Sequence, residues 1–93
     1  MKKQGSILIV DDNRSVLVAA KMLLENYFES VITTSIPDRI RSILQENEIG
    51  VILLDMNFKA GINNGNEGLF WLAEIKKYHP TLPVVLFTAY ADI

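Results

Sequence analysis

The chain has 93 residues, of which 49% are hydrophobic and 22% are charged, so it suits one globular domain with a single core and lacks the composition of a disordered chain. Its net charge is −2 and its 9 Lys and Arg residues are scattered, which indicates no direct nucleic-acid contact by this segment. It has no cysteine, no long apolar signal region and no apolar run near the roughly 20 residues that span a bilayer, so we expect a cytoplasmic protein without membrane contact.

Strand-like and helix-like segments alternate along the chain. The runs 7–10 and 51–54 are continuously aliphatic, which is typical of parallel strands buried on both faces. The patterns predict strands over 7–10, 30–34, 51–54 and 83–87. They predict a helix over 14–27 with Asn13 as its N-cap, and a second helix that begins near Ser35 and Pro37 and is closed by Gly50. A third helix is predicted over 66–78, and His79 and Pro80 end it. This alternation favours a doubly wound parallel α/β sheet with helices on both faces.

The spacing of apolar residues also predicts which side of each helix packs inward. For the first helix we expect the inward residues to be Val16, Ala19, Ala20, Leu23 and Tyr27. For the second and third helices we expect Ile36, Ile40, Ile43 and Leu44, and then Leu69, Leu72 and Ile75.

Three aspartates follow the two aliphatic runs. Asp11 and Asp12 come directly after the first run, and Asp55 comes directly after the second. Ligands of open α/β sheets bind outside the carboxyl ends of the strands, so we expect these carboxylates to lie together. Their mutual repulsion and their oxygen ligands favour a bound hard cation, Mg²⁺ or Mn²⁺. The alternative is that each aspartate only caps the helix that follows it.

These aspartates, together with Thr88 and Ala89 after the last strand, resemble the receiver domain of two-component response regulators over the whole chain. The stretch 84–92 is similar to receivers of the NtrC-like group, which precede an ATPase module and a DNA-binding helix-turn-helix. The resemblance implies a flavodoxin-like three-layer α/β/α fold with strand order 2-1-3-4, and residues 1–93 as one receiver domain.

The resemblance also implies a role for each acidic residue. Asp55 is similar to the phosphoacceptor, which takes a phosphoryl group from a phosphohistidine of a sensor histidine kinase. Asp12 and Asp55 would bind Mg²⁺ directly, and Asp11 would bind it directly or through water. The backbone carbonyl of Asn57 would complete the protein ligands.

Two further residues would respond to phosphorylation. Thr88 would move to hydrogen-bond the new phosphoryl oxygens, and the small Ala89 would leave room for them. The implied function is a signalling phosphoacceptor, not a turnover enzyme, which controls a downstream output domain that regulates transcription.

The chain departs from the family pattern in two places. Lys59 stands where receivers usually carry a proline, and the loop 56–68 is long and rich in asparagine. This loop is either a tolerated insertion or a device that alters kinase recognition or shields the acyl phosphate from water. The chain also ends at Ile93, before the family's fifth strand, its last helix and the lysine that pairs with the phosphoryl group. We therefore expect an incomplete receiver that is weakly phosphorylated and whose exposed sheet edge either drives self-association or leaves a loosened fold.

Two other functions compete with this interpretation. A pseudo-receiver would keep the fold and bind partners without phosphate, and it predicts weak Mg²⁺ binding and no acyl phosphate. A hydrolase with an aspartyl-phosphate intermediate usually carries a second aspartate two residues after the nucleophile, where this chain has Asn57.

Overall fold

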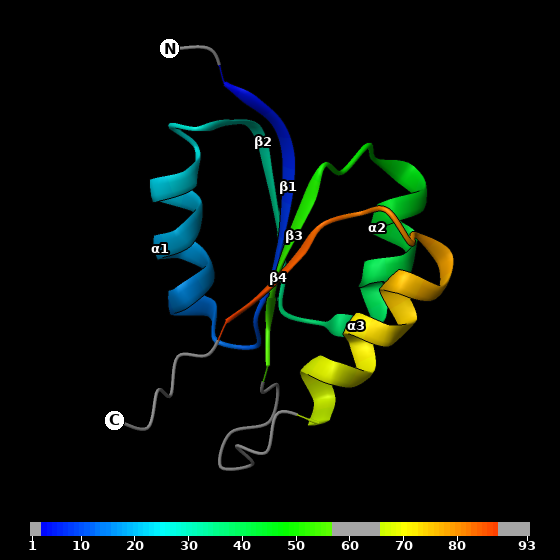
Figure 1. Cartoon of the computed structure of the whole chain (residues 1–93). Coiled ribbons are helices and arrows are strands. Elements are labelled where there is room, and N and C mark those ends of the chain that lie inside the picture. The colour runs from blue at the N-terminus through cyan, green and yellow to red at the C-terminus, as the bar shows by residue number, and fades with distance from the viewer. Residues whose placement is uncertain (1–2, 57–65, 88–93) are drawn as a thin grey trace.

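The computed structural model describes residues 3–56 and 66–87 of the chain (Figure 1). The elements in chain order are β1 (Gln4–Val10), α1 (Arg14–Leu24), β2 (Phe28–Thr34), the 3₁₀ turn η1 (Pro37–Arg39), α2 (Ile40–Glu46), β3 (Val51–Asp55), α3 (Asn66–Tyr78) and β4 (Val84–Phe87). This order confirms the predicted alternation of strands and helices. No helix in the described ranges is both long and apolar enough to cross a membrane.

The described strands form one parallel sheet in the order β2-β1-β3-β4, as predicted. Val10 at the end of β1 pairs with Thr34 on one side and with Leu54 on the other. Asp55 at the end of β3 pairs with Phe87 at the end of β4. The carboxyl ends of the strands therefore lie level with one another at one edge of the sheet.

Helices cover the two faces of the sheet, with α1 on one face and α2 and α3 on the other (Figure 1). Leu8 and Val10 of β1 pack into the core under α2 and α3, whereas Ile7 and Ile9 pack into the core under α1. Successive side chains of a strand point to opposite faces, so a strand covered on both faces needs apolar residues at every position. This explains the continuously aliphatic runs.

The first helix differs from the prediction in its length and its inward face. It ends at Leu24, and the residues that pack inward are Leu17, Ala20 and Leu24. Leu23 is 61% exposed and Ala19 is also exposed, so these two predictions were wrong. Tyr27 is exposed as well, and its carbonyl accepts a hydrogen bond from the backbone N–H of Gln4, beside the start of β2. The residues predicted to face inward and the residues that do face inward are both apolar, so their spacing alone did not distinguish the two sets.

The other two helices follow the prediction in part. Ile40 and Ile75 are buried, and Ile43, Leu44 and Leu72 pack against the same core. Ile36 and Leu69 are about half exposed, at 49% and 50%, so their predicted inward positions were wrong. Ile36 precedes the 3₁₀ turn and does not belong to the helix, and in α3 the inward position next to Leu69 is taken by the buried Gly68.

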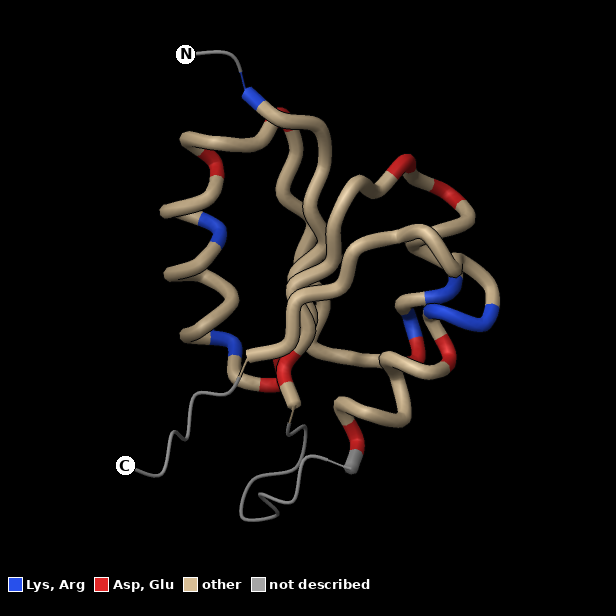
Figure 2. Tube along the Cα trace, in the orientation of Figure 1, with Lys and Arg blue, Asp and Glu red and all other residues tan. Residues whose placement is uncertain are grey.

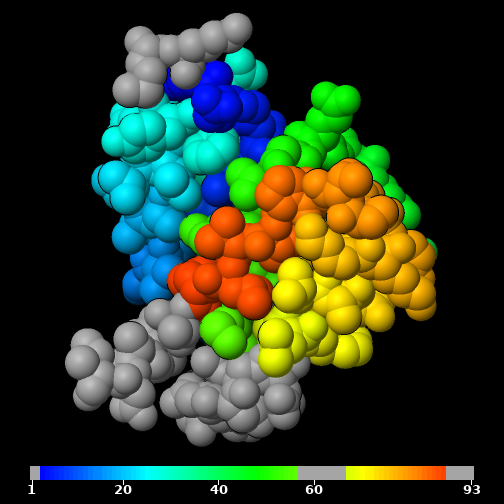
Figure 3. All heavy atoms as spheres, viewed as in Figure 1, coloured from blue at the N-terminus to red at the C-terminus, as the bar shows by residue number. Residues whose placement is uncertain are grey.

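Part of the apolar surface of β4 is left uncovered by the other described elements. Val84 and Leu86 pack toward α2 and α3, but Val85 points to the face on which α1 lies against β1 and β2. Val85 is 51% exposed as a result. Figure 3 shows β4, in orange and red, open at the surface in this view.

Candidate functional site: an acidic pocket at the carboxyl edge of the sheet

The sheet brings Asp11, Asp12 and Asp55 together, as the sequence predicted. One carboxylate oxygen from each residue lies within 4.8 Å of one from each of the other two. Asp11 and Asp12 follow β1 and Asp55 ends β3, and these strands are parallel neighbours in the sheet. Figure 2 shows acidic positions gathered at the carboxyl end of the central strands. Residues 44 positions apart in sequence, from 11 to 55, thus form one pocket.

Two of the three carboxylates are almost completely buried. Asp11 is 1% exposed and Asp55 is 4% exposed. The Oδ1 atom of Asp11 accepts a hydrogen bond from the backbone N–H of Asn13 at 2.8 Å, but its buried Oδ2 atom has no hydrogen-bond partner among the described residues. A buried carboxylate oxygen without a donor is unfavourable, whereas a coordinated cation satisfies it. The three residues therefore fit a hard divalent cation held by their carboxylate oxygens.

The third carboxylate, that of Asp12, is more open to solvent. Loss of hydration beside the pocket wall raises its pKa above the ordinary value, and the neighbouring negative charge of Asp11 raises it further. Glu67 at the start of α3 adds a smaller effect in the same direction. The pocket is therefore an environment of concentrated negative charge, which favours either a proton or a cation.

The alternative that the aspartates are only helix caps fails for α1. The side chain of Asn13 is the N-cap, as predicted: its Oδ1 accepts from the backbone N–H groups of Ser15 at 2.9 Å and Val16 at 3.3 Å. Asp11 accepts from Asn13 instead of from the helix. Residues 56–65 separate Asp55 from the first residue of α3, so Asp55 does not stand directly before the helix that follows it.

No sequence pattern indicated the role of Thr34, which supports the pocket from β2. Thr34 is 7% exposed, and its carbonyl accepts a hydrogen bond from the backbone N–H of Asp11 at 3.2 Å. Its Oγ1 accepts from the backbone N–H of Ile36 at 3.1 Å. This second bond stabilises the turn that leaves β2, next to the carbonyl that accepts from Asp11.

The remaining predicted site residues lie outside the described residues. These are Asn57, Thr88 and Ala89, together with Lys59 and most of the long loop. Thr88 follows Phe87, whose carbonyl accepts a hydrogen bond from the backbone N–H of Met56 at 2.8 Å.

The family model described as the response regulator receiver domain matches residues 7–93. The chain belongs to this family. The match includes both strand ends that carry the acidic pocket, and the resemblance inferred from the sequence is confirmed.

Two curated relatives of this receiver are transcriptional regulators. The chain is 33% identical over 92 residues to the alginate biosynthesis transcriptional regulatory protein AlgB of Pseudomonas aeruginosa. This match covers 99% of the chain and 19% of the relative. It is 28% identical over 91 residues to the DNA-binding transcriptional regulator NtrC of Salmonella typhimurium. This match covers 98% of the chain and 18% of the relative. The chain spans about a fifth of the length of these relatives, and the predicted similarity to NtrC-like proteins is confirmed.

Solved receivers have the same fold. The N-terminal signal receiver domain of a two-component system response regulator from Bacteroides fragilis is 54% identical, with a TM-score of 0.83 over 97% of this chain and 70% of that one. The response regulator TrrA from Thermotoga maritima, solved in complex with Mg²⁺–BeF, is 25% identical, with a TM-score of 0.76 over 95% of this chain and 72% of that one.

Proposed function

We propose that this receiver accepts a phosphoryl group on Asp55 from a sensor histidine kinase, in a reaction that depends on Mg²⁺ or Mn²⁺. The observation that carries the proposal is the cluster of Asp11, Asp12 and Asp55, whose ligand oxygens lie within 4.8 Å of one another. The buried Oδ2 of Asp11, without a donor among the described residues, supports a cation at the same place.

Asp55 is the residue that fits the acceptor role within this cluster. It ends β3, between the ends of β1 and β4, and it is the residue that the resemblance matches to the phosphoacceptor. Asp11, Asp12 and Asp55 would hold the cation, with the backbone carbonyl of Asn57 as a further ligand. Thr88 would report the phosphoryl group and Ala89 would leave space for it, as the resemblance implies.

The transfer is one displacement at phosphorus. A carboxylate oxygen of Asp55 attacks the phosphorus of the phosphohistidine, so that an O–P bond forms and the P–N bond breaks. The electron pair of the P–N bond stays on the leaving nitrogen, and the imidazole is neutral when its other ring nitrogen carries a proton. When bound, the cation supplies neutralisation of the charge on the phosphoryl oxygens. The receiver contributes the nucleophile and its orientation, as a phosphoacceptor and not as a turnover enzyme.

The partners follow from this function and from the names of the relatives. A sensor histidine kinase would donate the phosphoryl group, and its use of ATP implies a cytoplasmic location. AlgB is named a transcriptional regulatory protein and NtrC a DNA-binding transcriptional regulator. We therefore propose that phosphorylation of this receiver controls transcription through an output domain with ATPase and DNA-binding parts.

A further proposed partner is a second copy of the chain. Within the described residues β4 pairs with β3 alone, and its Val85 is 51% exposed. An open strand edge beside an uncovered apolar side chain favours association between copies. This contact between copies does not depend on the phosphoryl transfer.

The test is the intact mass of the chain after incubation with acetyl phosphate, with and without Mg²⁺. We expect a mass increase of one HPO₃ group that requires Mg²⁺ and disappears in Asp55→Asn. A longer chain that continues past Ile93 is the second control. An adduct on the longer chain alone would show that residues beyond Ile93 are needed for the transfer. No adduct on either chain would favour the pseudo-receiver alternative and overturn the proposal.

A further inference from the structure

Gly68 makes the closest backbone contact among the described glycines. It makes this contact with Asp55, which ends β3, and with Met56, which follows it. It is the third residue of α3 and is buried. A Cβ atom built on Gly68 would lie 2.5 Å from Cα of Met56, 2.8 Å from the carbonyl oxygen of Met56 and 3.0 Å from the carbonyl oxygen of Asp55. All three are main-chain atoms, so no side-chain rotation can relieve the contact.

The other two described glycines are different. A Cβ on Gly5 would meet nothing within 4 Å, and a Cβ on Gly50 would meet only the carbonyl oxygen of Ser6 at 3.5 Å, an ordinary contact. Among the described glycines, the requirement for a missing side chain is therefore specific to Gly68. At this place the helix α3 lies directly on the backbone that carries Asp55.

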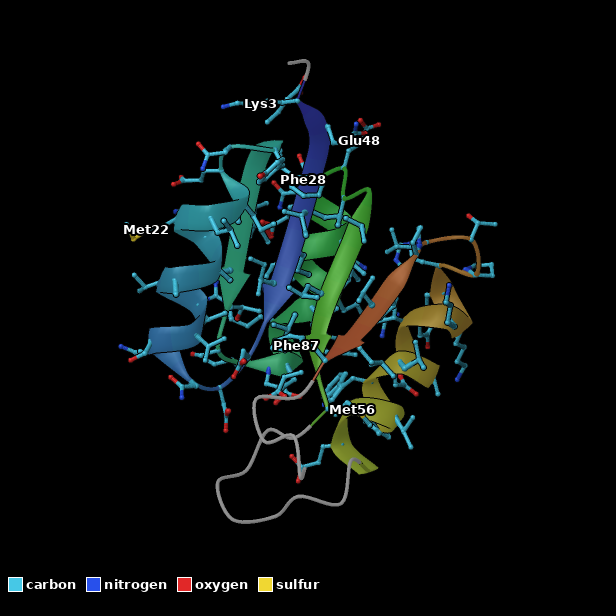
Figure 4. All side chains as sticks on the ribbon, turned by 60° about the vertical axis from the view of Figure 1, so that its left-hand side comes forward. Lys3, Met22, Phe28, Glu48, Met56 and Phe87 are labelled. Carbon is cyan, nitrogen blue, oxygen red and sulfur yellow. The ribbon has the colours of Figure 1, made fainter. Side chains whose placement is uncertain are left out.

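The contact is reinforced by hydrogen bonds on both sides of Met56. The backbone N–H of Gly68 donates to the carbonyl of Met56 at 2.9 Å, and the backbone N–H of Met56 donates to the carbonyl of Phe87 at 2.8 Å. Figure 4 shows Met56 and Phe87 at the carboxyl end of the sheet, beside the start of α3. The residue that follows Asp55 is thus held between α3 and the end of β4.

We propose that Gly68 is a positioning residue for the acidic pocket: its lack of a side chain allows α3 to fix the backbone of Asp55 and Met56, and with it the Asp55 carboxylate. The proposal rests on the proposed function of the pocket and deepens it. The Asp55 carboxylate must meet those of Asp11 and Asp12 around one small cation, and Mg²⁺ tolerates little departure from ideal geometry. A Cβ on Gly68 would require a shift of about an ångström to reach ordinary contact distances, which start at 3.4 Å.

Two parts of the molecule resist that shift in different ways. The end of β3 is held by its pairing with β1 and β4, while α3 is held by Ile75 in the core and by the bond from Lys76 Nζ to the carbonyl of Leu82 at 2.6 Å. A displacement of the β3 end would alter the pocket, whereas a displacement of α3 alone would leave it intact. The substitution Gly68→Ala decides between these responses.

The experiment compares Gly68→Ala with the wild type and with Gly5→Ala, which makes the same chemical change in open space. Mg²⁺ binding is measured by isothermal titration calorimetry at a temperature at which circular dichroism shows all three proteins folded. We expect Kd for Mg²⁺ to rise by about 10- to 100-fold in Gly68→Ala, the usual effect of disturbing a support of a metal ligand, and to stay unchanged in Gly5→Ala.

The variant Leu72→Ala distinguishes a purely structural role of Gly68 from a positioning role, because it loosens α3 without changing the contact of Gly68. If Leu72→Ala lowers the thermal midpoint as much as Gly68→Ala but keeps the wild-type Kd, the change in Kd reports positioning. If Gly68→Ala binds Mg²⁺ as the wild type does, or if both variants weaken binding equally, the proposal is overturned.

If Gly68→Ala is unfolded in buffer, all proteins are titrated in trimethylamine N-oxide, which favours the folded state, and a variant that stays unfolded there overturns the proposal because Gly68 would then support the whole fold. The mass measurement on the wild type tests the phosphoacceptor function separately. A wild type that is phosphorylated, with Kd unchanged in Gly68→Ala, would contradict the role of Gly68 alone.

Discussion

The backbone N–H of Asn13 donates a hydrogen bond to Oδ1 of Asp11 at 2.8 Å, while the side chain of the same asparagine caps α1. One residue therefore orients a carboxylate of the pocket and starts the helix that covers the sheet beside it. The start of α1 and the geometry of Asp11 are coupled through this short turn.

The substitution Asn13→Ala should lower the free energy of unfolding by about 1 kcal/mol, because the backbone N–H groups of Ser15 and Val16 lose their acceptor. Urea unfolding followed by circular dichroism measures the change. Asn13→Ser is the matched control, since serine is also a good N-cap, and it should stay close to the wild type. An Asn13→Ala variant as stable as the wild type would contradict the importance of the cap.

The raised pKa of Asp12 predicts a pH dependence of stability in the absence of metal. A carboxyl whose pKa is higher in the folded state binds protons more readily there, so its contribution to stability falls as the pH rises from 3.8, its ordinary value, through the folded pKa. The stability of the wild type relative to Asp12→Asn should therefore decrease over this interval and stay constant above it.

Urea unfolding in EDTA at a series of pH values from 3.8 upward measures the difference in unfolding free energy between the wild type and Asp12→Asn. Mg²⁺ should reverse the trend for the wild type, because a bound cation stabilises the ionised pocket. A relative stability that rises with pH in EDTA would contradict the prediction.

The exposed Val85 on β4 predicts concentration-dependent self-association. Val85→Lys should reduce the average mass measured by light scattering across concentrations, because a lysine on an open strand edge opposes pairing with another copy. Met22→Lys is the control, since Met22 of α1 is 68% exposed on another element. A wild type that remains monomeric at all concentrations would rule out the contact, and an effect of Met22→Lys alone would assign it to α1.

Lys76 stabilises the connection between α3 and β4. Its ammonium donates to the carbonyl of Leu82 at 2.6 Å, so Lys76→Met should lower the free energy of unfolding by about 1 kcal/mol while it keeps the apolar part of the side chain. Lys77→Met is a matched control, because the Lys77 ammonium lies over the ring of Tyr78, 5.5 Å from its centroid, on the exposed side. Equal losses from the two substitutions, measured by urea unfolding, would contradict the role of the Lys76 bond.

The sequence could predict features that depend on neighbours along the chain. The aliphatic runs before Asp11 and Asp55 identified two buried parallel strands, and Asn13 was recognised as a cap from its type and place. Parallel strands end at the same edge of a sheet, so the meeting of the aspartates followed from those strands alone. The order of the strands came from the resemblance to receivers and not from any pattern in the chain.

Which side of each helix faces the sheet was decided by the tertiary structure. The sequence placed Leu23 and Leu69 on inward faces, whereas Leu24 and Gly68 take those places. The rotation of a helix about its axis depends on what it packs against, and apolar residues on two adjoining stripes leave the choice open. For α3 the backbone of Met56 makes the choice, since only a glycine fits against it.

The supports of the pocket were equally invisible in the sequence. Thr34 and Gly68 hold the backbone beside Asp11 and Asp55 through contacts between residues that are distant along the chain. A threonine at a strand end or a glycine near a helix start has no special meaning until the fold brings another backbone next to it. The sequence by itself thus determined the elements and the acidic residues of this receiver, whereas the long-range packing of backbone on backbone decided how those residues are held.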